Sequence, residues 1–508
     1  MSLVSLLQSA RSLFANDRTK KSRRRARAAK RGLPTRLSVE RLDERVVLST
    51  FSVLNLADSG AGSLREAITA ANTNPGADVV AFAPGLRGTV GLTSGELGIT
   101  DNLWIDGPGA GRLTVSGNDT SRVFQIGSGA EVTIDDLTVT NGRAVWRGGG
   151  ILNAGTLTVS GVILSDNVVV GVPGATLGAV LDAFGGGIFN SGTLTVRDSG
   201  FVHNQAIGAD GTPSSIGSSA LGGAIASSGT PIAPATATVS YSRFSGNEAI
   251  GGAAGIGASR AGIGGALQNS ASTLTVTHSV FHDNQAVGGI DNGVPGGFGT
   301  GAGGAIVNVA RFGDSTISVS HSTLTNNRAV GGAAGAGPSG QDGRGGAIAN
   351  YIFGGVAPPV TVMATATVTD SILLGNQAIG GAGPTGGAGQ GGGIANLNGG
   401  VLTVSNSLIA LNRAIGGAGN GGNGGNGQGG GIFNGGPSPV GTPSLTLQRT
   451  LVVFNQADGG PAVNGGSAGQ GLGGGLYLAL GSVASADLTA ILANDASTSD
   501  DDVFGLLD

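Results

Sequence analysis

Two neighbouring carboxylates, Asp135 and Asp136, are the residues of this sequence whose types suit acid–base chemistry on a sugar. Paired carboxylates can bind calcium or act as general acid and base, and an acidic sugar also needs an arginine or lysine to meet its charge. No lysine follows residue 30. Because the pair lies between the apolar Ile134 and Leu137, a surface turn is the simpler interpretation. We therefore predict no catalytic residue here.

Histidines and other carboxylates are scattered. His203 and His282 occupy equivalent steps of a repeat, where outward surface histidines are expected, and spacing alone assembles no Ser/His/Asp constellation. Calcium binding by glycine-rich nonapeptides requires aspartates at fixed positions. The isolated aspartates are Asp291, Asp342 and Asp458. Residues 500–502 form an acidic run that offers an adventitious calcium site only, so the sequence predicts no metal and no cofactor.

Threonines recur in Thr-x-Thr steps whose side chains should point outward as two parallel columns. Flat threonine arrays of this kind occur in ice-binding solenoids, but threonine is also favoured on strand surfaces. The columns break at Val401 and Ser444, which leaves ice binding as a minor alternative. The steps are Thr156/Thr158, Thr193/Thr195, Thr236/Thr238, Thr273/Thr275 and Thr365/Thr367.

These residues belong to a repeat with three parts, seen in full at residues 185–208. Each copy has a glycine-bounded step ending on an aliphatic residue, a short alternating run, and a step that closes on asparagine. The aliphatic residues are Ile151, Ile188, Ile225, Leu267, Ile306, Ile348, Ile394, Ile432 and Leu476. The asparagines are Asn167, Asn204, Asn247, Asn284, Asn327, Asn376, Asn412, Asn455 and Asn494.

The repeat predicts three short strands per copy. Alternation of period two, as in Thr-Leu-Thr-Val at residues 193–196, is typical of a strand with one buried face. Three strands joined by turns form one coil of a right-handed parallel β-helix, and no coil can bury its inner face alone. We expect about eleven or twelve coils, roughly 4.8 Å apart, with the asparagines stacked as a structural ladder at one corner.

The paired steps resemble the GGxI and FxxN repeats of bacterial surface β-helices of the polymorphic outer membrane protein type. Gly186-Gly187-Ile188 and the step from Phe201 to Asn204 match best. Later copies place other apolar residues where that family prefers phenylalanine: Leu324, Leu373, Ile409, Val452 and Ile491. The resemblance covers roughly residues 130–494. It implies a surface protein, although β-helices serve as adhesins, lyases and inert spacers alike.

Residues 1–49 form a separate basic segment, with a net charge of +9 over residues 1–50 against −13 for the remainder. Residues 42–48 resemble the LEPR-XLL sorting motif of exported bacterial proteins: Leu42, Arg45 and Leu48 match, and Asp43, Glu44 and Val47 depart from it. A disordered basic tail is the alternative. The acidic, lysine-free body argues against nucleic-acid binding.

Residues 50–82 are expected to form an N-terminal cap, with a strand at 51–56 and a short helix that begins at Ser63 and ends at Ala71. Ser63 and Glu66 have the spacing of a capping box. Residues 62–68 resemble the SLREA-type segment before bacterial surface β-helices, with Gly62 in place of the usual cysteine. The β-helix should span residues 83–494 and residues 495–508 should close the last coil.

Glycine-rich inserts of nearly constant length follow the closing asparagines. Because free loops vary in length, we expect the inserts to leave the same corner of every coil and to stack as a flange, with mobile glycine loops as the alternative. Residues 421–427 repeat every three residues, as extended polyproline-II-like segments do.

The sequence as a whole predicts an exported, monomeric protein in the cell envelope or outside the cell, with a structural or adhesive role and a surface polysaccharide or envelope protein as partner. It has no cysteine and no apolar run long enough to span a membrane. The alternative is a polysaccharide lyase or hydrolase, since pectate-lyase-like enzymes share this fold. The aromatic residues available to sugars are Trp104, Trp146, Tyr241 and Tyr351.

Overall fold

The computed structural model describes residues 48–255, 260–291, 299–335, 337–353, 362–436 and 441–507. Residues from Leu48 onward form one compact unit. Most of the basic segment, with all but the last residue of its LEPR-XLL-like motif, lies outside the described residues. No helix in the described ranges is long and apolar enough to cross a membrane.

One turn of the chain, from residue 156 to residue 190, shows how the repeat folds. Strand β12 (Thr156–Ser160) buries Leu157 and Val159 and turns its threonines outward, as period two requires. The other strands of the turn are β13 (Ile163–Ser165), β14 (Val168–Val170), β15 (Ala183–Phe184) and β16 (Ile188–Asn190).

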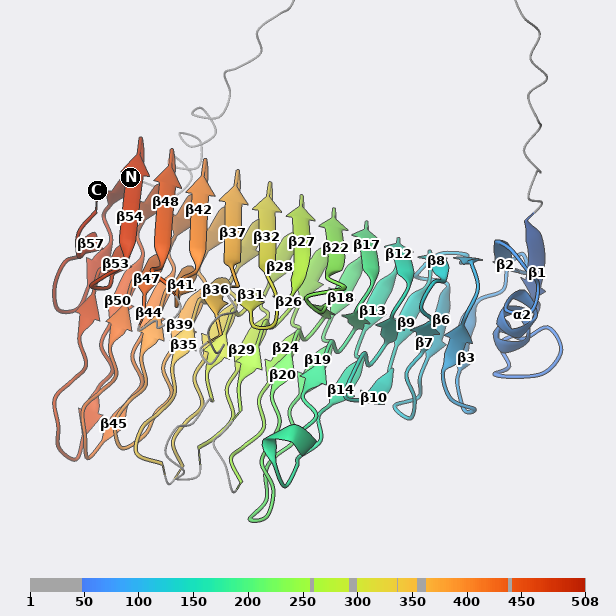
Figure 1. Cartoon of the computed structure of the whole chain (residues 1–508), viewed down its shortest axis with the longest axis horizontal. Helices are drawn as coiled ribbons and strands as arrows, with labels where there is room; N and C mark the ends of the chain where they lie inside the picture. Colours follow the sequence, from blue (N-terminus) through green and yellow to red (C-terminus); the bar gives the residue numbers. More distant parts are fainter. Residues whose placement is uncertain are drawn as a thin grey trace, which may run out of the picture. The chain divides into compact units, whose positions relative to one another are not determined.

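Every strand of this turn pairs in parallel with its counterpart one coil further along. β12 pairs with β17 (Thr193–Arg197), which places Leu157 opposite Leu194. Ile188, Ile225 and Leu267 are opposite one another in successive coils. Parallel crossovers are right-handed in nearly all proteins. The chain is therefore a right-handed parallel β-helix, as the repeat predicts, and Figure 1 shows the strands stacked in chain order.

The stacked strands build long sheets. Within the described residues, a thirteen-stranded sheet, here the threonine sheet, runs from β1 (Ser49–Val53) to β54 (Val483–Asp487). A twelve-stranded sheet, the glycine-step sheet, runs from β4 (Leu97–Ile99) to β57 (Val503–Phe504), and an eight-stranded insert sheet from β15 to β52 (Gly471–Leu472). Because β1 already pairs with β2 (Asp78–Phe82), stacking begins within residues 50–82.

The prediction of three strands per coil is too low. In the turn from 156 to 190, β14 and β15 are additional, and both have counterparts in the next coil. β14 begins directly after the closing asparagine and buries only its central residue, Val169, whose counterpart is Ala206. Three-residue and two-residue strands with such small inner side chains leave no alternating pattern long enough to recognise.

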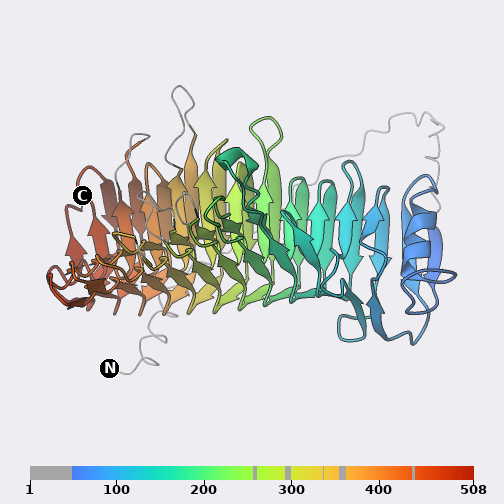
Figure 2. The ribbon, with the colours of Figure 1, turned by 90° about the horizontal axis from the view of Figure 1, so that it is seen from below.

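The short helix α2 (Leu64–Ala71) covers the first strands, as Figure 2 shows at the blue end. Its buried face consists of Leu64, Ala67, Ile68 and Ala71, the face that the sequence predicts. The Ser63 side chain accepts a hydrogen bond from the Glu66 N–H (3.2 Å). The Glu66 carboxylate accepts from the Gly62 N–H (2.5 Å) instead of the N-cap N–H, because Gly60 O already accepts the Ser63 N–H (3.1 Å).

The interior is one continuous apolar core with rings and aliphatic side chains stacked coil upon coil. Phe201, Phe244 and Phe281 stack face to face, with successive ring centroids 4.7 Å apart. Leu324 continues this column below Phe281 in the register of the strands. The column therefore stays buried in later repeats, where aliphatic residues take the place of phenylalanine.

A ladder of hydrogen bonds joins the nine closing asparagines inside the solenoid. The Asn204 amide donates to Asn247 Oδ1 (3.0 Å) and to Leu164 O (2.9 Å), and the pattern recurs from Asn167 to Asn455. Each Oδ1 from Asn204 onward also accepts the backbone N–H of the preceding asparagine. Each amide thus binds backbone groups that a buried turn would otherwise leave without partners.

A second ladder, which the sequence analysis does not predict, follows the glycine step two residues after the aliphatic mark. Asn269 donates to Asn308 Oδ1 (2.8 Å), and Asn308 to Asn350 Oδ1 (2.8 Å). In one coil a serine, Ser227, takes the place of asparagine and accepts from Asn190 (3.1 Å). The full set is Asn153, Asn190, Ser227, Asn269, Asn308, Asn350, Asn396 and Asn434.

The described parts of the glycine-rich inserts stack on one another and form the flange. Gly425 N–H donates to Gly417 O (2.8 Å) within one insert, and Gly417 N–H donates to Gly387 O (2.8 Å) in the insert of the preceding coil. The pattern repeats at Gly460, whose N–H donates to Gly425 O (2.8 Å). A Cβ atom on Gly417 would lie 2.1 Å from Gly381 O, so this packing requires glycine.

Replacing one asparagine of the corner ladder should destabilise the solenoid. Asn284→Ala removes the acceptor of two Asn247 donors (3.0 and 2.9 Å) and the donor to Asn327 Oδ1 (2.9 Å). We expect a loss of about 1–3 kcal/mol for each buried group left without a partner, measured by urea unfolding. Thr275→Ala, on the outer face of the same coil, is the control and should change stability by less than about 0.5 kcal/mol. Equal effects would contradict this role.

Gly417→Ala tests the flange. The added Cβ meets a carbonyl oxygen, so we expect a loss of about 1–3 kcal/mol and faster amide hydrogen exchange over residues 416–431. Gly98→Ala in β4 is the matched control, because no atom lies within 4 Å of its Cβ position. Fast exchange over 416–431 in the unsubstituted protein would show that the flange is not held by these hydrogen bonds.

Candidate functional site

The carboxylate pair lies on the surface and has protein partners. Asp135, at the end of β8 (Glu131–Asp135), accepts a hydrogen bond from Trp104 Nε1 (3.0 Å) and lies 4.0 Å from an Arg197 nitrogen. Asp136 follows at an exposed turn with φ of 50°. Asp136 thus occupies the surface turn that the sequence predicts, whereas Asp135 ends the strand before it and is half-buried.

The two histidines pair with different carboxylates. His203 Nδ1 lies 4.0 Å from Asp166, whereas His282 Nε2 lies 2.8 Å from Asp283. The described residues contain no group of three or more histidine, aspartate or glutamate side chains placed to hold a metal ion.

The remaining aspartates serve structural roles. Asp342 pairs with Arg344 and Asp458 with Arg413, each at 2.8 Å. Asp291 is buried, and its N–H donates to Ala333 O (2.8 Å). In the acidic run, Asp502 Oδ1 accepts the Asn494 amide (2.9 Å) and so terminates the corner ladder.

The outward threonines form the columns that the sequence predicts. Thr193 lies opposite Thr236, and Thr195 opposite Thr238, in the register of the threonine sheet. The nine ladder asparagines lie inside the solenoid, where no ligand reaches them. None of these residues creates a concave site.

A concave site does exist between the insert sheet and the outer face of the glycine-step sheet. One wall consists of β15, β20 (Ala220–Leu221) and β25 (Gly262–Ile263), and the other of β26 (Leu267–Ser270) and β31 (Ile306–Ala310). The cavity has a volume of about 360 Å³. A neighbouring cavity of about 490 Å³ shares Ala261, Ile263, Tyr351 and Phe353 with it. Together we call them the lateral groove.

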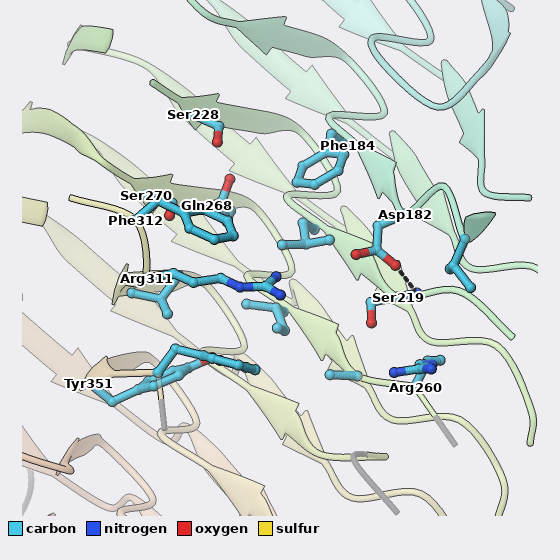
Figure 3. A pocket seen from close by; sticks show the side chains of 16 residues that line it. Asp182, Phe184, Ser219, Ser228, Arg260, Gln268, Ser270, Arg311, Phe312 and Tyr351 are labelled. Carbon is cyan, nitrogen blue, oxygen red and sulfur yellow. Dashed lines mark hydrogen bonds between the residues drawn. The ribbon is translucent and has the colours of Figure 1, made fainter. Parts of the chain in front are cut away.

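Charged groups face one another across the groove (Figure 3). The Asp182 carboxylate accepts a hydrogen bond from the Ser219 N–H (2.8 Å). Burial raises the pKa of Asp182, although that hydrogen bond and the positive charges of Arg260 and Arg311 act against the shift. Burial also lowers the pKa of Arg260, whose Nε donates to Gly217 O (3.0 Å).

Aromatic rings support the groove. Arg311 Cζ lies 4.7 Å from the ring centroid of Phe312 and 4.7 Å from that of Phe353, which is cation–π contact. Tyr351 on β36 (Ile348–Ile352) is half-buried. Burial of its phenol raises its pKa to about 12, although the positive charges of Arg344 and Arg311 act to lower it. Tyr351 is therefore a neutral hydrogen-bond donor at neutral pH.

Gln268 is the most informative residue of the groove. Its side chain is 1% exposed and lines the first cavity, yet neither amide atom has a hydrogen-bond partner among the described residues. In the coils on either side its position is occupied by Ala226 and Val307. Burying an unpaired amide is costly, so Gln268 has hydrogen-bonding capacity left for a polar group that enters the cavity.

The groove does not follow from the repeat pattern of the sequence. Of the aromatic candidates, Tyr351 lines it, whereas Trp146 contacts Arg147 (3.8 Å) and Tyr241 stacks on His278 (4.8 Å). One signal was present: eight arginines follow residue 150, and three of them, Arg260, Arg311 and Arg344, line the groove. A glutamine in a column of small and apolar residues was the other signal.

Comparisons with known proteins add little to this picture. No protein-family model matches the sequence, and no curated protein matches it. Solved structures with some similarity include a mannuronic acid specific polysaccharide family 6 lyase from human gut microbiota, with 10% identity, coverage of 82% of this chain and 83% of that chain, and a TM-score of 0.35.

Tailspike protein 3 of bacteriophage CBA120 has 12% identity, with 88% of this chain and 59% of that chain covered and a TM-score of 0.34. The GH87 α-1,3-glucanase catalytic unit from Streptomyces thermodiastaticus strain HF3-3 has 14% identity, 89% and 70% coverage and a TM-score of 0.32. These values are too low to bear on what this chain binds. The strand pairing itself defines the fold.

Asp182→Asn should stabilise the protein in a pH-dependent way. Burial raises the folded-state pKa of Asp182, so the folded protein favours the protonated carboxyl. The stability that the protonated carboxyl contributes is fully present below the unfolded-state pKa and is lost as the pH rises through the folded-state pKa. The asparagine mimics the protonated form. We expect a higher thermal midpoint than the unsubstituted protein at pH 7 and no such gain in strong acid. Asp136→Asn, at an exposed turn, is the control, and an equal gain there would contradict the assignment.

Proposed function

We propose that this chain is an exported β-helical protein that acts at the cell surface and binds a polysaccharide in the lateral groove. The observation that carries the proposal is the buried, unpartnered amide of Gln268 beside aromatic rings and arginines. Sugars present apolar ring faces and many hydroxyls, and such a lining suits both. Gln268 can donate to one hydroxyl and accept from another.

Export and surface location are supported by sequence resemblance. Residues 42–48 resemble a sorting motif, and the repeats resemble those of the polymorphic outer membrane protein type. In this proposal the stacked coils hold the groove rigid, and binding rather than turnover is the activity.

A polysaccharide lyase or hydrolase is the second candidate. It is favoured by the position of Asp182, an acid with a raised pKa, in the same cavity as the neutral phenol of Tyr351 and the cation of Arg311. An arginine can offset a uronate charge while one group removes a proton and another donates one. New reducing ends or unsaturated sugar ends on incubation with polysaccharides, lost in Tyr351→Phe, would favour this candidate.

Gln268→Met is the direct test of the binding site. The variant keeps the size of the side chain but removes its polar atoms, so we expect polysaccharide affinity to fall about tenfold, the equivalent of about 1.4 kcal/mol. Affinity is measured by calorimetry with the polysaccharides that a glycan panel selects. Gln125→Met is the matched control, because Gln125 occupies the same outer column in β7 (Phe124–Ile126), is exposed and lies outside the groove.

If the unsubstituted protein binds no polysaccharide, the proposed function is wrong. Equal affinity of Gln268→Met and Gln125→Met would place the binding site elsewhere.

A further inference from the structure

Three successive coils each place one arginine in the lateral groove. Arg260 precedes β25, Arg311 follows β31 in the next coil, and Arg344 lies on β35 (Gly343–Arg344) in the coil after that. The strands of the insert sheet pair in this order, and β25 leads through β30 (Gly301–Ala302) to β35. Coils are about 4.8 Å apart, close to the advance of a linear polysaccharide per hexose.

The positive charge of the groove is only partly offset. Asp342 pairs with Arg344 (2.8 Å), and Asp182 faces both Arg260 and Arg311. Three cations thus meet two carboxylates, in a body that carries a net charge of −13 after residue 50. A groove with excess positive charge on an otherwise acidic protein attracts anionic ligands.

A second unpartnered donor lies in the other cavity. Arg344 Nε is buried and has no hydrogen-bond partner among the described residues, although its Nη2 donates to Asp342. The Gln268 amide in the first cavity and the Arg344 Nε in the second therefore both lack hydrogen-bond partners among the described residues, and they lie along one groove. A ligand that satisfies both must extend across several coils.

We propose that the ligand is a linear anionic glycan that lies along the solenoid axis, with carboxylate or sulfate groups on successive sugars bound by Arg260, Arg311 and Arg344. This inference rests on the proposed function and specifies its ligand. Arginine forms paired hydrogen bonds with both kinds of oxyanion. The rings of Phe184 and Phe312 line the first cavity and offer apolar faces to the sugars, and Gln268 binds a hydroxyl.

The test uses the full chain and calorimetry with oligosaccharides of two to six sugars, in three series: uronates, sulfated sugars and carboxyl-reduced uronates of the same lengths. We expect affinity for one anionic series to rise steeply from two to four sugars and then to level off, with weak binding of the reduced series. Arg311→Gln and Arg344→Gln should each weaken anionic binding about tenfold. Arg413→Gln, a surface arginine outside the groove, is the control.

Asp182→Asn supplies an effect of opposite sign. Removing this carboxylate frees Arg260 and Arg311, so affinity for the anionic series should increase at pH 7 relative to affinity for the reduced series. A loss of folding cannot produce such an increase.

The possible failures are distinct. Equal binding of charged and reduced series overturns this inference and leaves the proposed function standing. Absence of binding to any series and to the glycan panel overturns both. Equal affinity for a single-stranded oligonucleotide of similar charge overturns the assignment of a glycan, because the groove would then select charge alone.

Discussion

The structure depends on one constraint: each coil can satisfy its inner face only against the same residues of the next coil. Leu157 buries its side chain beside Leu194, and Asn204 completes its hydrogen bonds through Asn247. Apolar stacking and buried amide ladders therefore require the same register. A slip of one residue would turn Leu157 outward and leave the asparagines unpaired inside. This double requirement fixes the register of strands only two to six residues long.

The sequence reveals most of this arrangement because the constraint repeats. The Thr-Leu-Thr-Val runs, the glycine-bounded aliphatics and the closing asparagines each recur at equivalent points, and the right-handed β-helix follows from them. Strands such as β14 and β15 are hidden because they bury one small side chain each. The second asparagine ladder is hidden for a different reason: Ser227 interrupts its pattern, because the hydroxyl accepts from Asn190 but pairs with Ser272 (2.9 Å) instead of Asn269.

The lateral groove could not be predicted from repeated sequence patterns. Arg260 lies at the end of an insert and Arg311 in the connection that follows β31, where the sequence does not repeat. Their approach to Asp182 depends on how three separate segments return to the solenoid. Repetition reports what the coils have in common, whereas a site is created by what differs between coils. Gln268 illustrates this, since it departs from Ala226 and Val307 in a column that is otherwise small or apolar.

The corner ladder also has a direction. Between the asparagines, every amide donates to Oδ1 of the next coil and its own Oδ1 accepts from the coil before, so the side-chain carbonyl dipoles align head to tail along the axis, as peptide dipoles do in an α-helix. Their partial positive end is Asn494, and the carboxylate of Asp502 meets it at 2.9 Å. The solenoid thus has an electrical polarity of its own, and a negative charge at its positive pole completes the series.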